Sequence, residues 1–371
     1  MMLIILPFVK SASVLLAFLY FAGAENSHKL RKTNPQCETP LVFETLTHPP
    51  LNKEPKIRFS ITPPEGTGHI DSPMILAGEH VVVYFAGLFG SRLEHFESPD
   101  DRNRPFLITL DRPGSGCTNP WKELGPGNTQ YTQVADVVLE LLDDVNATSF
   151  EAVGWSSGGP YALALAHQFE ARAETSLSLT RATVVAGDPQ WARSSLSTYL
   201  HAPHHVLMMF AARCLPRWAL SLAIHVGLHI LWGAGQVEIL SSEEMKKMIA
   251  NFAEGARFKG DSFDAFADDI VLERANDWGF ELEDIKSPVR VLHSPGDKIV
   301  PFAAGVENAD RLPNGVLVDM GGEWSLYSEG HLIMEEYWGQ IMDWAVSLEE
   351  LGGPVKKVEK EEENVNTHDE F

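Results

Sequence analysis

Short apolar runs rich in β-branched residues alternate with longer, helix-like stretches along most of the chain. The predominantly apolar runs lie at 80–85, 105–110, 149–154, 182–186, 289–293 and 315–319, and a further strand is expected near 56–61. Strands of this kind, separated by helical stretches, are typical of βαβ units with helices on both faces of the sheet. The pattern therefore predicts an α/β fold with a mostly parallel central sheet.

The interval between the fourth and fifth runs has a different character. Residues 190–285 contain no strand-like run, which predicts a helical lid inserted above the carboxyl ends of the strands, where α/β sheets bind ligands. Within it, residues 219–232 are unusually apolar. One interpretation is a lid helix that packs on the core. The alternative is a surface that contacts lipid, in which case the lid would bind the membrane peripherally.

A length of 371 residues suits one large domain with an insertion. The expected core comprises residues 56–189 and 286–350, on either side of the lid at 190–285. Residues 25–55, polar and interrupted by prolines, form an extended segment in front of it.

The first residues have the features of a targeting segment. Lys10 precedes an apolar run at 13–21, and Ala22-Gly23-Ala24 offers small residues for signal peptidase, so residues 1–24 are predicted to be a signal peptide. An uncleaved N-terminal membrane anchor is the alternative, because the apolar stretch from Leu3 approaches the ~20 residues that cross a bilayer.

The last residues, 351–371, are rich in glutamate, lack apolar periodicity and are expected to be a disordered acidic tail. The chain ends in His368-Asp-Glu-Phe371, which resembles the His-Asp-Glu-Leu address except for the final phenylalanine. Together with a signal peptide, this ending favours the lumen of the endoplasmic reticulum over secretion, with a retention receptor as a partner.

Composition narrows the range of partners and covalent features. The chain has 51 acidic and 29 basic residues, so its formal net charge is −22. A surface with this charge repels nucleic acid. In an oxidising compartment one pair among Cys37, Cys117 and Cys214 could form a disulfide, and the sequence leaves the pairing open. Asn146-Ala-Thr148 fits the N-glycosylation pattern, so a glycoprotein is expected.

The strongest motif for chemistry is Gly154-Trp155-Ser156-Ser157-Gly158, between a predicted strand and a predicted helix. In such a cramped turn only glycine leaves room beside the serine, whose hydroxyl then projects above the sheet. The helix N-terminus also offers backbone N–H groups to a developing oxyanion. Ser156 is therefore the predicted nucleophile.

A serine nucleophile needs a base, and the base needs an acid that orients it. Asp297 follows the predicted strand 289–293 and is our choice of acid, with Asp188, after the strand at 182–186, as the alternative. His331 follows the last predicted strand and precedes an amphipathic helix, which singles it out among fourteen histidines as the base. These residues follow one another in the chain order Ser, Asp, His.

In these motifs the chain resembles the α/β-hydrolase superfamily over about residues 56–350, apart from the lid. Residues 86–92 look like the superfamily's His-Gly-x-Pro-Gly-Ser-Arg loop, although Ala86 and Phe89 depart from it, and 111–116 look like its Asp-Arg-Pro-Gly-x-Gly turn, a structural element. The resemblance implies an oxyanion hole made by the backbone N–H groups of Leu88 and Ser157.

The predicted function is that of a serine hydrolase, an esterase- or lipase-like enzyme acting on a small ester or lipid-like substrate with a hydrophobic acyl group. No cofactor or metal is expected. The same residues also suit an acyltransferase or a peptidase, and a non-catalytic binding protein that kept the fold is the alternative from another class.

Overall fold

A computed structural model describes most of the region in which strands are expected. The described residues are 57, 59–62, 76, 78–88, 90, 92, 105–113, 118, 130–172, 176–201, 203–223, 264–275, 277–297, 299–320, 331, 334, 338 and 339. The predicted signal peptide at 1–24, the extended segment at 25–55 and the acidic tail at 351–371 lie outside this set.

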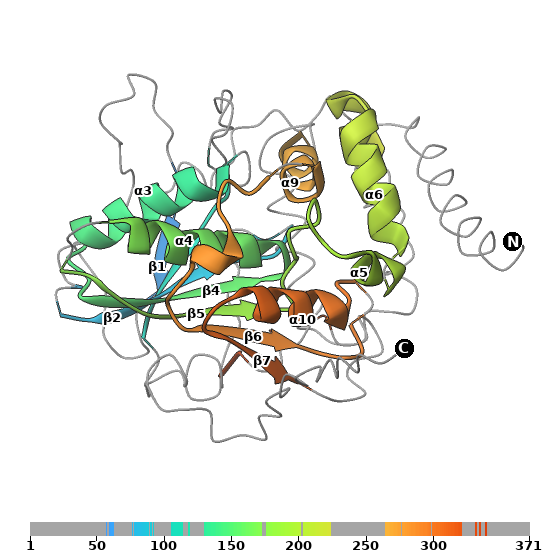
Figure 1. The fold of residues 1–371 in the computed structure, drawn as a ribbon. Helices are drawn as coiled ribbons and strands as arrows, with labels where there is room; N and C mark the ends of the chain where they lie inside the picture. The colour runs from blue at the N-terminus through green and yellow to red at the C-terminus, as the bar shows by residue number, and fades with distance from the viewer. Residues whose placement is uncertain are drawn as a thin grey trace, which may run out of the picture.

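In the described part of the chain, seven strands form one sheet. Figure 1 shows that the sheet is twisted. The strands are β1 (Phe59–Thr62), β2 (His80–Phe85), β3 (Phe106–Leu110), β4 (Ser149–Trp155), β5 (Ser178–Val185), β6 (Val289–His293) and β7 (Gly315–Asp319). Their spatial order is β1-β3-β2-β4-β5-β6-β7, and only β1 pairs antiparallel with its neighbour. The mostly parallel sheet that the sequence predicts is therefore confirmed.

Helices cover the sheet and its carboxyl edge. Helices α4 (Gly159–Ala171) and α10 (Phe302–Arg311) contact strands, and α3 (Gln130–Asp144) packs on α4. Between β5 and β6 the described residues include α5 (Leu196–His201), α6 (Pro203–Cys214), a helical stretch at 217–223 and α9 (Asp264–Ala275). Short 3₁₀ turns lie at Ser156–Gly158 and Leu282–Asp284. Figure 1 shows α5, α6 and α9 beside the end of the sheet to which the parallel strands run. These three helices fall within the predicted lid, and the middle of that region, 224–263, lies outside the described residues.

One core joins the sheet to α3 and α4. Alternate residues of the central strands, such as Val81, Val83 and Phe85 in β2, face this core, as alternation in a strand requires. Helix α3 buries Tyr131, Val134, Ala135, Val138 and Leu142 at helical spacing, which explains why this stretch folds as an amphipathic helix. The central strands are buried almost completely, so their geometry fixes the positions of the loops at their ends.

The order of strands reverses direction between β2 and β4. The chain passes from β2 outward to β3 and then returns to β4 on the other side of β2, so β2 and β4 are neighbours, paired from His80↔Ser149 to Phe85↔Gly154. In open α/β sheets such a reversal leaves a crevice at the carboxyl ends of the two strands. The loops after β2 and β4 meet here.

Several other predictions can be compared with the described residues. Asn146 is exposed in the turn after α3, and its glycosylation stays a prediction. Cys214 is exposed and free, whereas Cys37 and Cys117 lie outside the described residues. Among the described residues, no helix has the length and apolar character needed to cross a bilayer.

Candidate active site

Ser156 occupies a tight turn between β4 and α4. Its φ of 53° lies in the left-handed region, an unfavourable conformation for a residue with a side chain. The flanking glycines allow it: a Cβ on Gly154 would lie 2.3 Å from the Gly158 carbonyl oxygen, and a Cβ on Gly158 would lie 2.0 Å from that of Phe85. The motif that the sequence singles out is therefore a strained turn that only glycines at these two positions can form.

A line of hydrogen bonds runs from Ser156 through His331 to Asp297. His331 Nε2 lies 3.1 Å from Ser156 Oγ, and His331 Nδ1 lies 2.8 Å from Asp297 Oδ2. All three side chains are less than a tenth exposed. With Nδ1–H donated to the carboxylate, Nε2 is free to accept the Ser156 proton, which is the arrangement that general-base activation of a hydroxyl requires.

The turn after β6 keeps Asp297 ionised. Its Oδ1 accepts the backbone N–H groups of Ile299 (2.8 Å) and Val300 (3.0 Å). Burial raises the pKa of Asp297, but the charge of His331 and hydrogen bonds from His293 and His331 outweigh it, so the pKa falls to about 2. Asp297 is therefore a carboxylate throughout the range in which histidines ordinarily titrate.

Trp155, the residue before Ser156, contacts the histidine from the other side. Its indole Nε1–H donates to the His331 carbonyl oxygen at 3.1 Å, and the two rings lie 5.8 Å apart. After His331, the helical residues Met334 and Trp338 are buried, and Trp338 packs edge-on against Tyr84 of β2. His331 is thus fixed through its backbone as well as its ring.

The loop after β2 lies against the Ser156 turn and is anchored by the residues that follow β3. Arg92 N donates to Asp111 Oδ1 at 2.8 Å, the Arg92 guanidinium pairs with the same carboxylate, and Arg112 donates to the Gly87 carbonyl oxygen. A Cβ on Gly87 would lie 3.5 Å from the Ser156 Cβ. Leu88 belongs to this loop, and it packs on a cluster formed by Leu220 and residues of α6 and α9.

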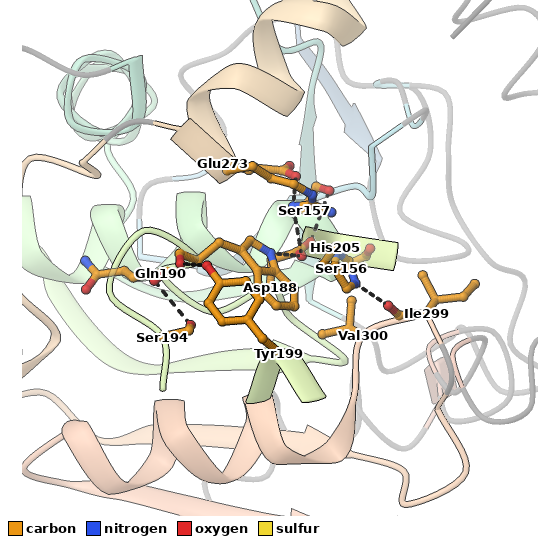
Figure 2. A network of polar contacts seen from close by, with 12 residues as sticks. Ser156, Ser157, Asp188, Gln190, Ser194, Tyr199, His205, Glu273, Ile299 and Val300 are labelled. Carbon is orange, nitrogen blue, oxygen red and sulfur yellow. Dashed lines mark hydrogen bonds and ion pairs between the residues drawn. The ribbon is translucent and has the colours of Figure 1, made fainter. Parts of the chain in front are cut away.

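Asp188, the alternative acid, has other partners. Its carboxylate accepts hydrogen bonds from Trp191 Nε1 (2.6 Å) and Ser157 Oγ (3.3 Å), and it pairs with Arg274 of α9 (3.3 Å). The histidine that contacts Ser156 has Asp297 as its partner, and Asp188 lies beneath the turn (Figure 2).

Some residues of this region carry no recognisable sequence signal. Asp269, Glu273 and Arg274 of α9 are buried beside the Ser156 turn, yet they belong to a helix without a motif. His293, the last residue of β6, donates Nε2–H to Val300 O at 2.9 Å and approaches Asp297 Oδ2 at 3.5 Å. Nothing in the sequence around these positions distinguishes them from ordinary surface or core residues.

Among the described residues, no three His, Cys, Asp or Glu side chains gather in a group suited to a metal ion. His205 of α6 is buried. Its ring stacks on Trp191 at 3.9 Å, and its Nε2 lies 2.5 Å from the Ile299 carbonyl oxygen.

The sheet order and the hydroxyl-bearing turn at its reversal point define an α/β protein with a polar site at the carboxyl ends of its strands. A family model described as the alpha/beta hydrolase fold matches residues 80–330, and the chain belongs to that family. The resemblance inferred from the sequence motifs is confirmed. No curated protein sequence matches the chain significantly.

Solved structures agree on the fold. A hydrolase from Pseudomonas aeruginosa PA01 is 14% identical, with a TM-score of 0.52, and the match covers 82% of this chain and 97% of that one. An enol-lactonase from Burkholderia xenovorans LB400 (19% identity, 79% and 96% covered, TM-score 0.48) and a bromoperoxidase from Bacillus anthracis (16%, 80% and 96%, 0.49) are also similar. At these identities the likeness concerns the fold alone.

The Arg92–Asp111 pair gives a test of how the loop is held. We expect Asp111→Ala to lower the free energy of unfolding by about 3–5 kcal/mol, because it removes the carboxylate that a buried guanidinium and a buried backbone N–H share. Urea unfolding measures the loss. Asp143→Ala, which removes an exposed pair with Arg172, is the control and should cost below about 1 kcal/mol. Equal losses in the two variants would contradict the anchoring role of Asp111.

Proposed function

We propose that the protein is a serine hydrolase of carboxylic esters, in which Ser156 is the nucleophile, His331 the general base and Asp297 the acid that orients it. The observation that carries the proposal is the buried line of hydrogen bonds from Ser156 Oγ to His331 and from His331 to Asp297. Membership of the alpha/beta hydrolase fold family supports it. Because that fold also serves other chemistries, the argument depends on the site.

In the proposed reaction Ser156 Oγ attacks the ester carbonyl while His331 Nε2 takes its proton. Asp297, ionised and bonded to Nδ1–H, stabilises the imidazolium. The alcohol leaves with a proton from His331, and water then attacks the acyl-enzyme, with His331 again as base. The backbone N–H groups of Leu88 and Ser157 are assigned to the oxyanion, because the loop after β2 lies against the Ser156 turn.

The acyl group is proposed to be hydrophobic. Four large apolar side chains between β5 and β6, namely Leu196, Leu200, Phe210 and Trp218, are 61–73% exposed. Exposed apolar side chains gathered in the region above the strand ends are expected where a hydrophobic molecule or a lipid surface is recognised.

Removal of the nucleophile tests the reaction. We expect Ser156→Ala to lose labelling by a fluorophosphonate probe and to lower kcat on p-nitrophenyl butyrate by about 10⁴-fold to 10⁶-fold, with folding preserved. Ser178→Ala, which removes an exposed hydroxyl at the start of β5, is the control and should still be labelled. A folded wild-type protein that is not labelled would refute the proposal and favour a binding function.

The identity of the acid is tested by two isosteric changes. Asp297→Asn should lower kcat on the order of 10⁴-fold, because an amide cannot stabilise the imidazolium and selects the wrong histidine tautomer. Asp188→Asn should lower it much less, since Asp188 contacts Ser157, Trp191 and Arg274 in place of His331. Steady-state kinetics on the same ester decide, and the opposite ranking would transfer the acid role to Asp188.

Chain-length preference tests the substrate class. Relative to p-nitrophenyl acetate, p-nitrophenyl octanoate should be cleaved with a kcat/KM at least about tenfold higher, because each buried methylene contributes about 0.8 kcal/mol. Replacing both Phe210 and Trp218 by serine should reduce the octanoate rate more than the acetate rate. If the wild type cleaved the two esters at equal rates, the proposed preference for a hydrophobic acyl group would be wrong.

A further inference from the structure

A buried group of charges lies directly behind the Ser156 turn. It contains three carboxyl groups, those of Asp188, Asp269 and Glu273, and two guanidinium groups, those of Arg112 and Arg274. Each of these residues is at most 4% exposed. Two of the carboxyls and one guanidinium come from α9, the helix that precedes β6, so the group joins this helix to the core. Figure 2 shows Glu273 and Asp188 of this group beside Ser157.

Asp188 connects this group to the proposed site. Its backbone N–H donates to the Ser156 carbonyl oxygen at 3.3 Å, and its side chain accepts from the Ser157 hydroxyl at 3.3 Å. Ser157 is also the residue whose backbone N–H is assigned to the oxyanion. The position of that N–H therefore depends on where Asp188 lies.

Glu273 shares a cation with Asp188. Arg274 NH1 lies 3.0 Å from Glu273 Oε2 and 3.3 Å from Asp188 Oδ1. The Ser157 hydroxyl, which donates to Asp188, also faces Glu273, whose oxygen Oε1 is buried. An ionised carboxylate in such a buried site carries a large desolvation cost.

The charges balance only when one carboxyl carries a proton. Arg112 pairs with Asp269 at 3.5 Å, which leaves Arg274 alone to neutralise both Asp188 and Glu273. Burial raises the pKa of Glu273, the charge of Asp188 raises it further, and Arg274 and the Ser157 hydroxyl offset this only in part, so the pKa is about 8. Asp269 also raises it.

The other titratable groups around Glu273 are Arg112 after β3, Tyr131 of α3 and Tyr161 of α4. Burial raises the pKa of both tyrosines well above the usual value, so they stay neutral when Glu273 titrates. Burial raises the pKa of Asp269 as well, but the charge of Arg112 and hydrogen bonds from Tyr161 and Gln130 oppose that shift. At Glu273 the charges of Asp188 and Asp269 add to the effect of burial, so Glu273 is the group whose charge we expect to change near neutral pH.

We propose that Glu273, in its protonated form, is a positioning residue of the hydrolase site: it leaves Arg274 to Asp188, and Asp188 then holds Ser157 and its oxyanion-binding N–H in place. The proposal rests on the proposed function. Ionisation of Glu273 adds a buried negative charge beside Asp188, competes for Arg274 and weakens the support of the Ser156 turn. The protein should therefore lose activity in mild alkali while Ser156, His331 and Asp297 remain unchanged.

The experiment is the pH dependence of the second-order rate of fluorophosphonate labelling, from pH 6 to 9.5. With a pKa of about 8, about nine-tenths of Glu273 is ionised at pH 9. The wild-type rate should therefore fall roughly tenfold from its maximum by pH 9. Glu273→Gln, which cannot ionise, should keep its maximal rate at that pH. Glu79→Gln, which changes an exposed carboxyl, is the matched control and should show the wild-type profile.

A second variant keeps the test valid if Glu273→Gln fails to fold, as judged by near-UV circular dichroism. Asp188→Asn removes a charge that raises the pKa of Glu273, so the alkaline loss of rate should move to lower pH. A wild-type rate that stays constant from pH 7.5 to 9.5, or an unchanged alkaline loss in Glu273→Gln, would overturn the proposal. Absence of wild-type labelling at every pH would refute the proposed function itself.

Discussion

The geometry of the site depends on one close approach, that of the turn after β4 to the end of β2. At Gly158 the backbone passes so near the carbonyl oxygen of Phe85 that even a methyl group would clash, and Gly154 faces the same turn from the strand side. This contact forces Ser156 into a left-handed conformation. Strain of this kind persists only where the surrounding packing fixes it, and here β2 and β4 are adjacent, fully paired and buried.

Two buried carboxylates lie near Ser156, and their surroundings give them different tasks. Asp297 accepts two backbone N–H groups and faces His331, so its charge is stabilised and available to an imidazolium. Asp188 is bonded to an indole, a hydroxyl and a guanidinium, so its hydrogen-bonding capacity is used within the protein. The pair shows how partners, rather than residue type or distance along the chain, separate a proposed catalytic role from a structural one.

The sequence predicts the frame of this molecule well because the frame depends on local patterns. Apolar runs with β-branched residues identify the central strands, and the glycines around Ser156 identify the strained turn, since both signals arise from neighbouring residues. The choice between Asp297 and Asp188 stays open in the sequence, because both follow a strand end and only the folded chain brings one of them to His331. The buried charges of α9 give no signal at all, because a helix with four acidic residues among twelve has the composition of an exposed helix.

The buried charges of α9 attach this helix to the core of the protein. A helix attached only through apolar contacts would be free to shift by small steps, whereas Arg274, shared between Glu273 and Asp188, has a fixed set of partners. Because the group contains three carboxyls and two guanidiniums, its net charge is zero only when one of the carboxyls is protonated. Asp188 also accepts a hydrogen bond from Ser157, the residue next to the proposed nucleophile. Any change of charge in the group therefore acts on the turn that positions Ser156, which couples the helix above the sheet to the chemistry at its edge.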